Sequence, residues 1–239
     1  SVLGGEGKDN FDYTTITGND TVVGGEVNDT SPTNSGDKLN AHDSVDDLTV
    51  IFDGDESGMM SDDSGTVTFS EIEHILGGLG NDSIDASASN VQQILDGGGG
   101  SDTITGGSGD DIIAMGQTQD YSAPDGADDV LVLKDGFGDD SIEGFETPTE
   151  TTPGVFSGND LLDVAGLQDA IGNPVNVDDV TVTDSNGNGT GDAILQFPNG
   201  ESITLWGVSI SDVSSDAQLI AMGIPAAPVA GTITINDAI

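Results

Sequence analysis

The chain has 239 residues, of which 44 are Asp or Glu and three are Lys or Arg, so its formal net charge is -41. Such an acidic surface repels phosphate backbones and anionic membrane surfaces, and no run of about 18 apolar residues could span a bilayer, so nucleic-acid binding and membrane insertion are not expected. The absence of cysteine excludes disulfides, thiolate nucleophiles and iron–sulfur clusters. Because only 34% of the residues are hydrophobic and the carboxylates repel one another, we expect the chain either to be disordered or to be held together by something cationic.

The N-terminal segment, residues 1–44, opens with a glycine-rich nonapeptide. Residues 4–12 read Gly-Gly-Glu-Gly-Lys-Asp-Asn-Phe-Asp and match the pattern G-G-x-G-x-D-x-U-x, in which U is a large apolar residue. Partial copies follow at 18–22 and 24–29. The chain starts at Ser1 without a charged-then-apolar signal pattern, and we expect it to be a piece of a longer polypeptide.

Residues 45–76 have a different pattern. The runs 48–52 and 66–69 are rich in β-branched and aromatic residues and flank an acidic loop at 53–65. We predict an inserted β-hairpin that caps or interrupts the repeat.

The repeat is strongest in residues 77–146, which we predict to be the core of the fold. Perfect copies stand at 77–85, 97–105 and 106–114, and the last two follow each other without a gap. Worn copies continue the register at 115–123, 124–132 and 135–143. Four perfect matches, counting the copy at 4–12, exceed what a glycine-rich composition produces by chance.

Residues 147–223 are predicted to form a β-rich C-terminal cap, followed by an extended tail at 224–239. A Pro/Thr loop at 147–155 precedes strand-like runs at 180–183, 193–197 and 202–206, with a tight turn at Pro198-Asn199-Gly200. A short helix is expected within 212–222, capped by Ser211 or Asp212. The loop 184–192 begins like an EF-hand but has Leu195 in place of the final Glu, so we interpret it as a strand connection.

These nonapeptides resemble the RTX (repeats-in-toxin) family of secreted bacterial proteins. The resemblance implies an all-β fold, a parallel β-roll or β-solenoid stapled by several Ca²⁺ ions. Glycines at the first, second and fourth positions permit positive φ and close backbone approach, so carbonyl groups can turn inward beside the Asp carboxylate. Calcium takes six to eight such oxygens, so each ion would lie between two stacked turns. The eighth residues Phe11, Ile84, Ile104, Ile113, Leu131 and Ile142 would point into the core.

The resemblance also implies a set of calcium ligands. The side chains would be Asp9, Asp20, Asp29, Asp82, Asp102, Asp111, Asp120, Asp129 and Asp140, and the backbone carbonyls those of Gly4, Glu6, Gly77, Leu79, Gly97, Gly99, Gly106 and Ser108. Two nonapeptides form one coil in this family, so turns on one edge should recur about every 18 residues. That spacing places Asp82, Asp102, Asp120 and Asp140 on one edge and Asp111 and Asp129 on the other.

No enzyme site stands out in the sequence. His42 and His74 lack the H-E-x-x-H spacing, and no phosphate-binding loop occurs. We therefore expect a non-catalytic, secreted calcium-binding module that folds on extracellular calcium and serves a structural, adhesive or surface-assembly role, with like subunits or other surface components as partners. The alternative is an accessory domain of a secreted hydrolase, epimerase or Hint-type self-processing protein. Gly223-Ile224-Pro225 resembles a Hint junction, although Ala226 replaces its cysteine.

Overall fold

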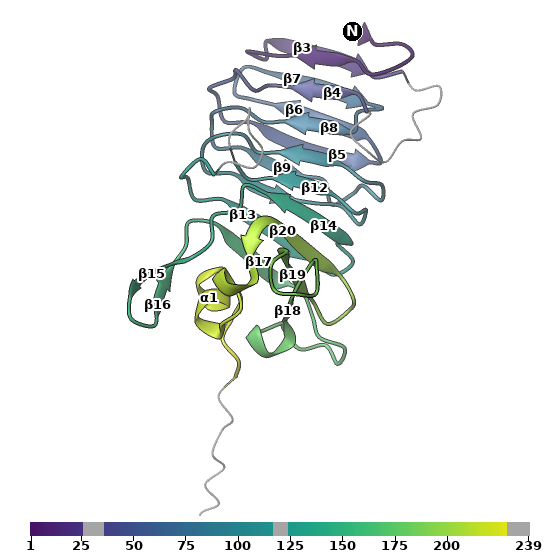
Figure 1. Ribbon diagram of the computed structural model, residues 1–239. Helices are drawn as coiled ribbons and strands as arrows, with labels where there is room; N and C mark the ends of the chain where they lie inside the picture. The colour runs from purple at the N-terminus through teal and green to yellow at the C-terminus, as the bar shows by residue number, and fades with distance from the viewer. Residues whose placement is uncertain (26–35, 117–123, 229–239) are drawn as a thin grey trace, which may run out of the picture.

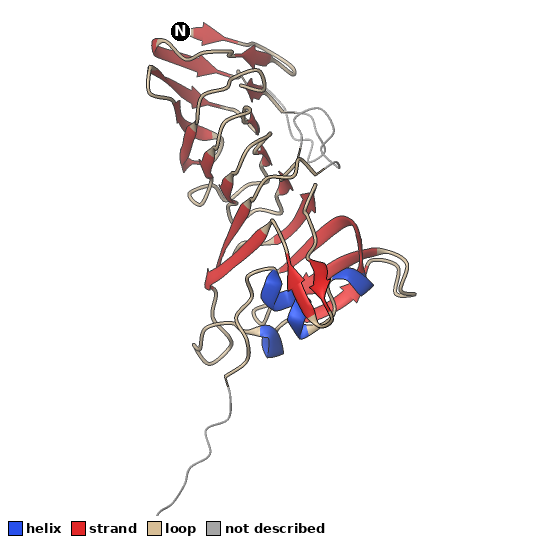
Figure 2. Ribbon diagram, turned by 90° about the vertical axis from the view of Figure 1, so that its left-hand side faces the viewer, coloured by secondary structure: helices blue, strands red, loops and turns tan. Residues whose placement is uncertain are grey.

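The strands of the chain stack into a two-layered roll, seen in the computed structural model, which describes residues 1–25, 36–116 and 124–228. Along the chain the strands pass back and forth between two sheets, so that each sheet grows by mostly parallel pairing from the N-terminal end to the C-terminal end (Figures 1 and 2). This arrangement is a parallel β-solenoid, as the resemblance implied.

Sheet A has nine strands, which are, in spatial order, β1 (Val2–Leu3), β3 (Gly18–Val23), β7 (Gly65–Ser70), β6 (Ser57–Ser61), β5 (Thr49–Gly54), β9 (Ser83–Asp85), β11 (Thr103–Thr105), β13 (Val130–Lys134) and β17 (Leu161–Gly166). Sheet B also has nine: β2 (Asn10–Asp12), β4 (Lys38–Asn40), β8 (His74–Leu76), β10 (Ile94–Asp96), β12 (Ile112–Ala114), β14 (Asp139–Glu143), β20 (Ser202–Ser209), β19 (Asp192–Gln196) and β18 (Thr181–Asp184).

The core lies between the sheets and is a pair of apolar ladders. In sheet A, Ile84 pairs in register with Ile104, which pairs with Leu131 in the next coil. In sheet B, Leu95, Ile113 and Ile142 stack in the same way. All six eighth-position residues expected in the core are buried there. Because three-residue strands alternate their side chains, one inward residue per strand suffices to build the ladder, and the polar residues beside it face outward.

The inserted segment 45–76 differs from the two-stranded hairpin expected from the sequence. It forms three antiparallel strands, β5, β6 and β7, and β6 lies within the stretch expected to be an acidic loop. The outer two strands pair in parallel with the roll, β5 with β9 and β7 with β3. Met60 and Gly58 allow β6 to pack in the layer, because Met60 is fully buried and Gly58 lies against Phe69. The insertion therefore extends sheet A from within.

The C-terminal end of the roll is covered by antiparallel structure. β20 pairs in parallel with β14 and then turns back through β19 and β18, as the tight turn at Gly200 predicted. A separate hairpin of β15 (Thr149–Thr152) and β16 (Val155–Ser157) lies beside α1 (Asp216–Ala221), with 3-10 turns η1 (Val177–Asp179) and η2 (Ile210–Asp212) nearby (Figure 1). The helix begins after Ser215, not after Ser211 or Asp212, because the Ser215 and Gln218 side chains form a capping box.

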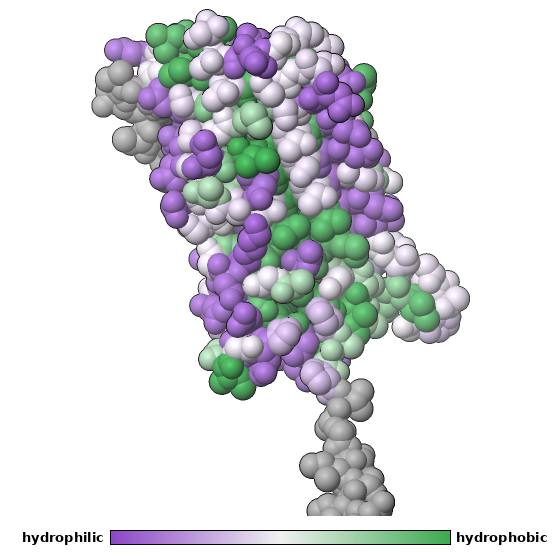
Figure 3. Space-filling view, turned by 180° about the vertical axis from the view of Figure 1, so that it is seen from behind, coloured by the Kyte–Doolittle hydropathy of each residue, from purple (hydrophilic) through white to green (hydrophobic). Residues whose placement is uncertain are grey.

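The outer surface separates polar from apolar residues along the roll. Seen from behind, hydrophilic residues gather along the two sides, and apolar residues show along the middle (Figure 3). Exposed Ile51 and Met59 belong to β5 and β6. No helix among the described residues is long and apolar enough to cross a membrane.

Candidate calcium sites

The turns that connect the sheets form two edges of the roll. Turns leading from sheet B to sheet A make edge 1, which includes the turns 77–82 and 97–102. Turns leading from sheet A to sheet B make edge 2, which includes the turns 4–9 and 106–111. In each of these turns the Asp of the nonapeptide directly precedes a strand, so parallel pairing of the strands stacks the Asp residues in columns.

On edge 1 the column consists of Asp82, Asp102, Asp129 and Asp160. Each Asp uses its Oδ1 atom to accept a hydrogen bond from the backbone N–H of the preceding member: Asp82 donates to Asp102 at 2.7 Å, Asp102 to Asp129 at 2.7 Å, and Asp129 to Asp160 at 3.2 Å. The first member is joined in the same way to Leu48 of the inserted segment, at 2.8 Å. The carboxylates therefore tie successive coils together.

On edge 2 the same bonding occurs in two shorter runs. The N–H of Asp9 donates to Asp37 Oδ1 at 2.7 Å, and the N–H of Asp111 donates to Asp140 Oδ1 at 2.8 Å. Gln93, which has no carboxylate, donates its N–H to Asp111 Oδ1 at 2.7 Å. A carboxamide in this position breaks the acidic column, and residues 86–93, which lead to it, contain no glycine.

The expected edges of Asp129 and Asp140 were wrong. The spacing put Asp140 with Asp82 and Asp102, whereas the structure puts Asp129 on that edge and Asp140 opposite, with Asp111. The reason is that β13 pairs directly with β11, so 27 residues separate Asp102 from Asp129 where one coil of two nonapeptides has 18. Counting nonapeptides along the sequence cannot reveal which strands pair in the sheet.

Of three other expected ligands, the structure describes one, and it stands apart from the columns. Asp20 lies inside β3, opposite Val67, and so belongs to a strand and not to a turn. Asp29 and Asp120 lie outside the described residues. Conversely, Asp37 and Asp160 are column members that were not among the expected ligands, although 158–163 resembles one more worn turn. A signal was present, since each is followed two positions later by a buried Leu, Leu39 and Leu162.

Several column carboxylates have one oxygen without a hydrogen bond. Among the described residues, the buried Oδ2 atoms of Asp9, Asp102, Asp129 and Asp140 accept none. A buried carboxylate oxygen without a hydrogen bond or a positive charge is strongly unfavourable, and such atoms in native proteins are normally paired, protonated or bound to a metal.

Several backbone carbonyl oxygens in the same described turns also lack a hydrogen-bond donor. In the described chain, no hydrogen-bond donor reaches the carbonyl oxygens at the first and third positions of three turns, namely those of Gly77, Leu79, Gly97, Gly99, Gly106 and Ser108. The second-position carbonyl of Gly78, by contrast, accepts from the N–H of Gly99 at 2.9 Å. The free carbonyls are those implied as calcium ligands by the resemblance.

First-position glycines are required because the oxygens crowd them. A Cβ atom on Gly77 would meet the carbonyl oxygen of Gly97 and Oδ2 of Asp82, and a Cβ on Gly97 would meet Oδ2 of Asp102. The oxygens of two adjacent turns thus converge on a space that only glycine leaves open.

Burial shifts the titration of these carboxyl groups. Desolvation raises the pKa of Asp102, Asp140 and Asp160 to about 8 and that of Asp129 to about 7. It raises the pKa of Asp82 and Asp111 to about 6, where two backbone N–H groups per carboxylate offset part of the effect. A cation placed between the turns would reverse these shifts by stabilising the charged form.

The donor set fits calcium. Hard oxygen ligands from carbonyls and a carboxylate are what Ca²⁺ selects, and soft or nitrogen ligands are missing from the turns just described. No group of three or more Asp, Glu or His side chains in the described part of the chain is arranged to hold a metal. That finding agrees with sites in which each turn supplies one carboxylate and the backbone supplies the remaining oxygens.

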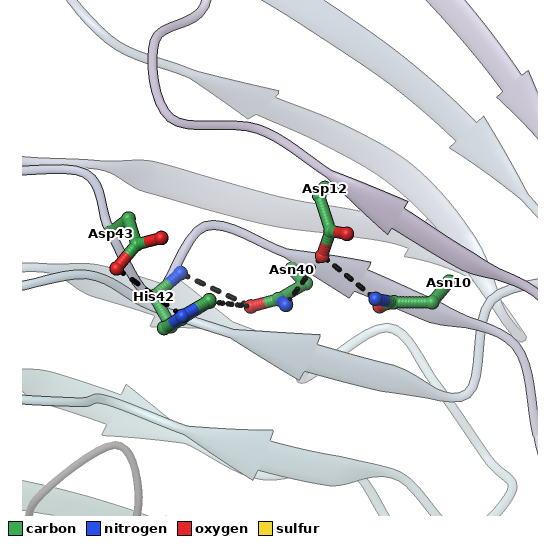
Figure 4. A network of polar contacts seen from close by, with 5 residues as sticks. All are labelled: Asn10, Asp12, Asn40, His42 and Asp43. Carbon is green, nitrogen blue, oxygen red and sulfur yellow. Dashed lines mark hydrogen bonds and ion pairs between the residues drawn. The ribbon is translucent and has the colours of Figure 1, made fainter.

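The histidines serve other purposes. His42 belongs to a polar network on β2, β4 and the following turn, in which Asp12 accepts from Asn10 and Asn40 at 2.7 and 2.6 Å, and the His42 ring contacts Asn40 and Asp43 at 3.0 and 3.3 Å (Figure 4). His74 is buried, and desolvation lowers its pKa to about 3, so it is neutral at pH 7.

A match to a family model supports this interpretation. The family model for the RTX calcium-binding nonapeptide repeat matches in four copies, at residues 17–30, 68–90 and 93–121; the perfect copy at 4–12 lies outside these stretches. No curated protein matches the sequence. Among solved structures, the chain is similar to the extracellular lipase LipA from Serratia marcescens, with 20% identity, 90% of this chain and 37% of the lipase chain covered, and a TM-score of 0.31. The chain thus spans well under half of that lipase's length.

The repeat pattern, the stacked carboxylates and the family match agree with one another, and RTX nonapeptide repeats bind Ca²⁺. The chain therefore contains RTX calcium-binding nonapeptide repeats, which here form a β-roll.

Proposed function

We propose that this β-roll is a secreted, non-catalytic module that folds when it meets extracellular calcium. The observation that carries the proposal is the presence, in the columns, of buried carboxylate oxygens without a hydrogen bond, among them Oδ2 of Asp9, Asp102, Asp129 and Asp140. Without a cation, stacking these groups at neutral pH costs free energy for every coil. With calcium between the turns, the same groups hold the coils together.

The ligand set also supports an extracellular setting. A site made of carbonyls and few carboxylates is of the weak class, which fills at the millimolar calcium found outside cells and stays empty at cytosolic concentrations. A chain of net charge -41 would then remain extended before export and fold afterwards. By resemblance to the RTX proteins, the export route would be type I secretion.

Circular dichroism of the full chain, with calcium and with EDTA, tests this proposal. The β-sheet spectrum should appear on adding about millimolar calcium and disappear with EDTA at about pH 8. Magnesium at the same ionic strength is the control. It demands rigid octahedral geometry and should not induce folding, whereas simple screening of charge would make the two ions equally effective. A β spectrum that EDTA leaves unchanged would overturn the proposal.

We further propose a structural role in a surface or adhesive assembly, with like subunits or other surface components as partners. Its support is the pair of acidic edges, on which exposed Asp110 and Asp128 lie next to the column residues and offer carboxylates to calcium shared with a neighbour. Light scattering during a calcium titration tests this role. Growth of the scattered mass with calcium supports assembly, and a monomer at every concentration refutes it, while the folding proposal is tested separately by circular dichroism.

A further inference from the structure

The nonapeptide turns occur in two conformations that differ at the second glycine. In the turn 77–82 the N–H of Gly78 donates to Asp82 Oδ2 at 2.7 Å, and in the turn 106–111 the N–H of Gly107 donates to Asp111 Oδ2 at 2.7 Å. Since the Oδ1 atoms of both residues already bond to the preceding coil, both oxygens of each carboxylate are occupied. We name this conformation the closed turn.

In three other turns the second glycine donates elsewhere, and the carboxylate keeps a free oxygen. Gly5 donates to the carbonyl of Gly24 at 2.9 Å and Gly136 to Glu201 Oε1 at 2.5 Å, while Oδ2 of Asp9 and of Asp140 have no partner. In the turn 97–102, the N–H of Gly98 donates to Asp96 Oδ1 at 3.0 Å, and Oδ2 of Asp102 has no partner. We name this conformation the open turn.

Backbone angles separate the two kinds in the same way. In the open turns the second and fourth glycines have positive φ, for example 97° at Gly98 and 109° at Gly100. Gly78, Gly80, Gly107 and Gly109 of the closed turns lie outside the left-handed region. The two conformations thus differ in backbone as well as in the acceptor of one N–H group.

From this comparison we infer that Asp96 is a positioning residue, which holds the turn 97–102 open and so leaves the carboxylate of Asp102 available to calcium. Asp96 directly precedes the first glycine of its turn and is fully buried, and its own Oδ2 atom is also without a hydrogen bond, so the test below must separate positioning from ligation. The closed turns have Leu76 and Thr105 in the equivalent place, and neither side chain accepts a hydrogen bond from its turn. The open turns 4–9 and 135–140 follow Leu3 and Lys134, and there the acceptor for the second N–H comes from elsewhere in the fold, from Gly24 and Glu201. This inference rests on the proposed calcium binding and adds which residue prepares a site.

The mechanism is a competition for one N–H group. When Asp96 accepts it, Gly98 stays in the left-handed region and Asp102 Oδ2 faces no donor within the turn. Without that acceptor, the N–H of Gly98 would turn to Asp102, as that of Gly78 turns to Asp82. Calcium would then have to displace a hydrogen bond to a charged group, which weakens binding by about tenfold.

The variants Asp96→Leu and Asp96→Asn test this assignment in the full chain. Leu reproduces the residue that precedes the closed turn 77–82, whereas Asn removes the charge but keeps an oxygen acceptor. Calcium titration against a competing chelator should show one site weakened about tenfold in Asp96→Leu and near-normal affinity in Asp96→Asn. Asp85→Leu is the matched control. Asp85 ends β9 and accepts a hydrogen bond from Ser87 N–H at 3.0 Å in the same way. The turn after it ends in Gln93, which has no carboxylate to offer to calcium.

The outcomes separate this inference from the proposed function. If the unmodified chain binds no calcium, the proposed function fails and the inference fails with it. If the unmodified chain binds calcium and Asp96→Leu binds equally well, only the inference is wrong. Equal weakening by Leu and Asn would show that Asp96 acts through its charge or as a ligand, which also refutes a positioning role. Should Asp96→Leu not fold in calcium, Asp96→Thr provides the same test, because Thr105 precedes the other closed turn.

Discussion

Asp102 Oδ1 accepts a 2.7 Å hydrogen bond from the backbone N–H of Asp82, one coil away, while its Oδ2 atom is buried without a partner. One carboxylate therefore has two functions in the roll. Its first oxygen fixes the register between coils, and its second is prepared for a cation. An Asn side chain could perform the first function but not the second.

Replacing Asp102 by Asn should therefore have opposite effects with and without calcium. In calcium, the variant should bind about one ion fewer and unfold at lower denaturant concentration, because a charged ligand is lost. In EDTA at about pH 8, where the unmodified chain is expected to be unfolded, it should retain as much β-sheet signal as the unmodified chain or more, because an uncompensated buried charge has been removed. Urea unfolding in calcium, circular dichroism in EDTA and ion counting by mass spectrometry measure these effects. Asp163→Asn, in an exposed position on β17, should change neither.

The calcium-free roll should lose stability as the pH rises. The folded-state pKa values of Asp102 and Asp140, about 8, lie above the ordinary value of 3.8, so the folded state binds more protons than the unfolded state between about pH 4 and pH 8. Stability contributed by the protonated groups is present below this window and lost through it. His74, whose pKa is lowered from 6.5 to about 3, has the opposite effect, because it makes the folded state more stable as the pH rises between these two values. This single group is outweighed by the several carboxyl groups whose pKa is raised.

Circular dichroism in EDTA at about pH 5 and about pH 8 tests this pH dependence. The β-sheet signal should be larger at about pH 5, and saturating calcium should remove or reverse the difference, because the metal binds the ionised carboxylates. An equal signal at the two pH values without calcium would contradict the burial of unpaired carboxylates.

Two glycines of one turn should respond differently to substitution by alanine. A Cβ on Gly97 would collide with the carboxylate of Asp102, whereas a Cβ on Gly99 would find its nearest neighbour, Leu79 Cδ2, at 3.6 Å. We expect Gly97→Ala to lower the free energy of unfolding in calcium by about 1–3 kcal/mol and to weaken calcium binding. Gly99→Ala should be close to neutral. Thermal unfolding with calcium titration distinguishes them, and equal effects would argue against a crowded first position.

The apolar ladder predicts that two further substitutions by alanine will have very different effects. Ile104 is fully buried between Ile84 and Leu131, so Ile104→Ala should lower the free energy of unfolding in saturating calcium by about 2–5 kcal/mol. Ile51→Ala, at a side chain 47% exposed on β5, should cost far less. Denaturant unfolding at fixed calcium measures both. A mild effect at Ile104 would mean that the turns, and not the core, determine stability.

Much of this architecture could be predicted from the sequence. The nonapeptide dictates its own local structure, since glycines permit the turn, Asp supplies the oxygen and the eighth residue supplies the core. Ile84, Ile104 and Ile113 were expected in the core and are buried there. The antiparallel strands at the C-terminal end could be predicted equally well, because Pro198-Asn199-Gly200 is a local turn signal between alternating runs.

Tertiary structure alone decided which turns stack on which. Asp129 lies on the edge of Asp102 because β13 pairs with β11, and a repeat count along the chain cannot show that pairing. The strand β6 exists because a partner lies on each side of it, not because its own residues favour extension. The difference between open and closed turns is likewise invisible in the motif, since Gly78 and Gly98 occupy the same position. The acceptor of the second N–H group depends on which oxygens the folded chain brings near it. Gly78 donates to Asp82, whereas Gly98 donates to Asp96, and so Asp102, but not Asp82, keeps a free oxygen for calcium.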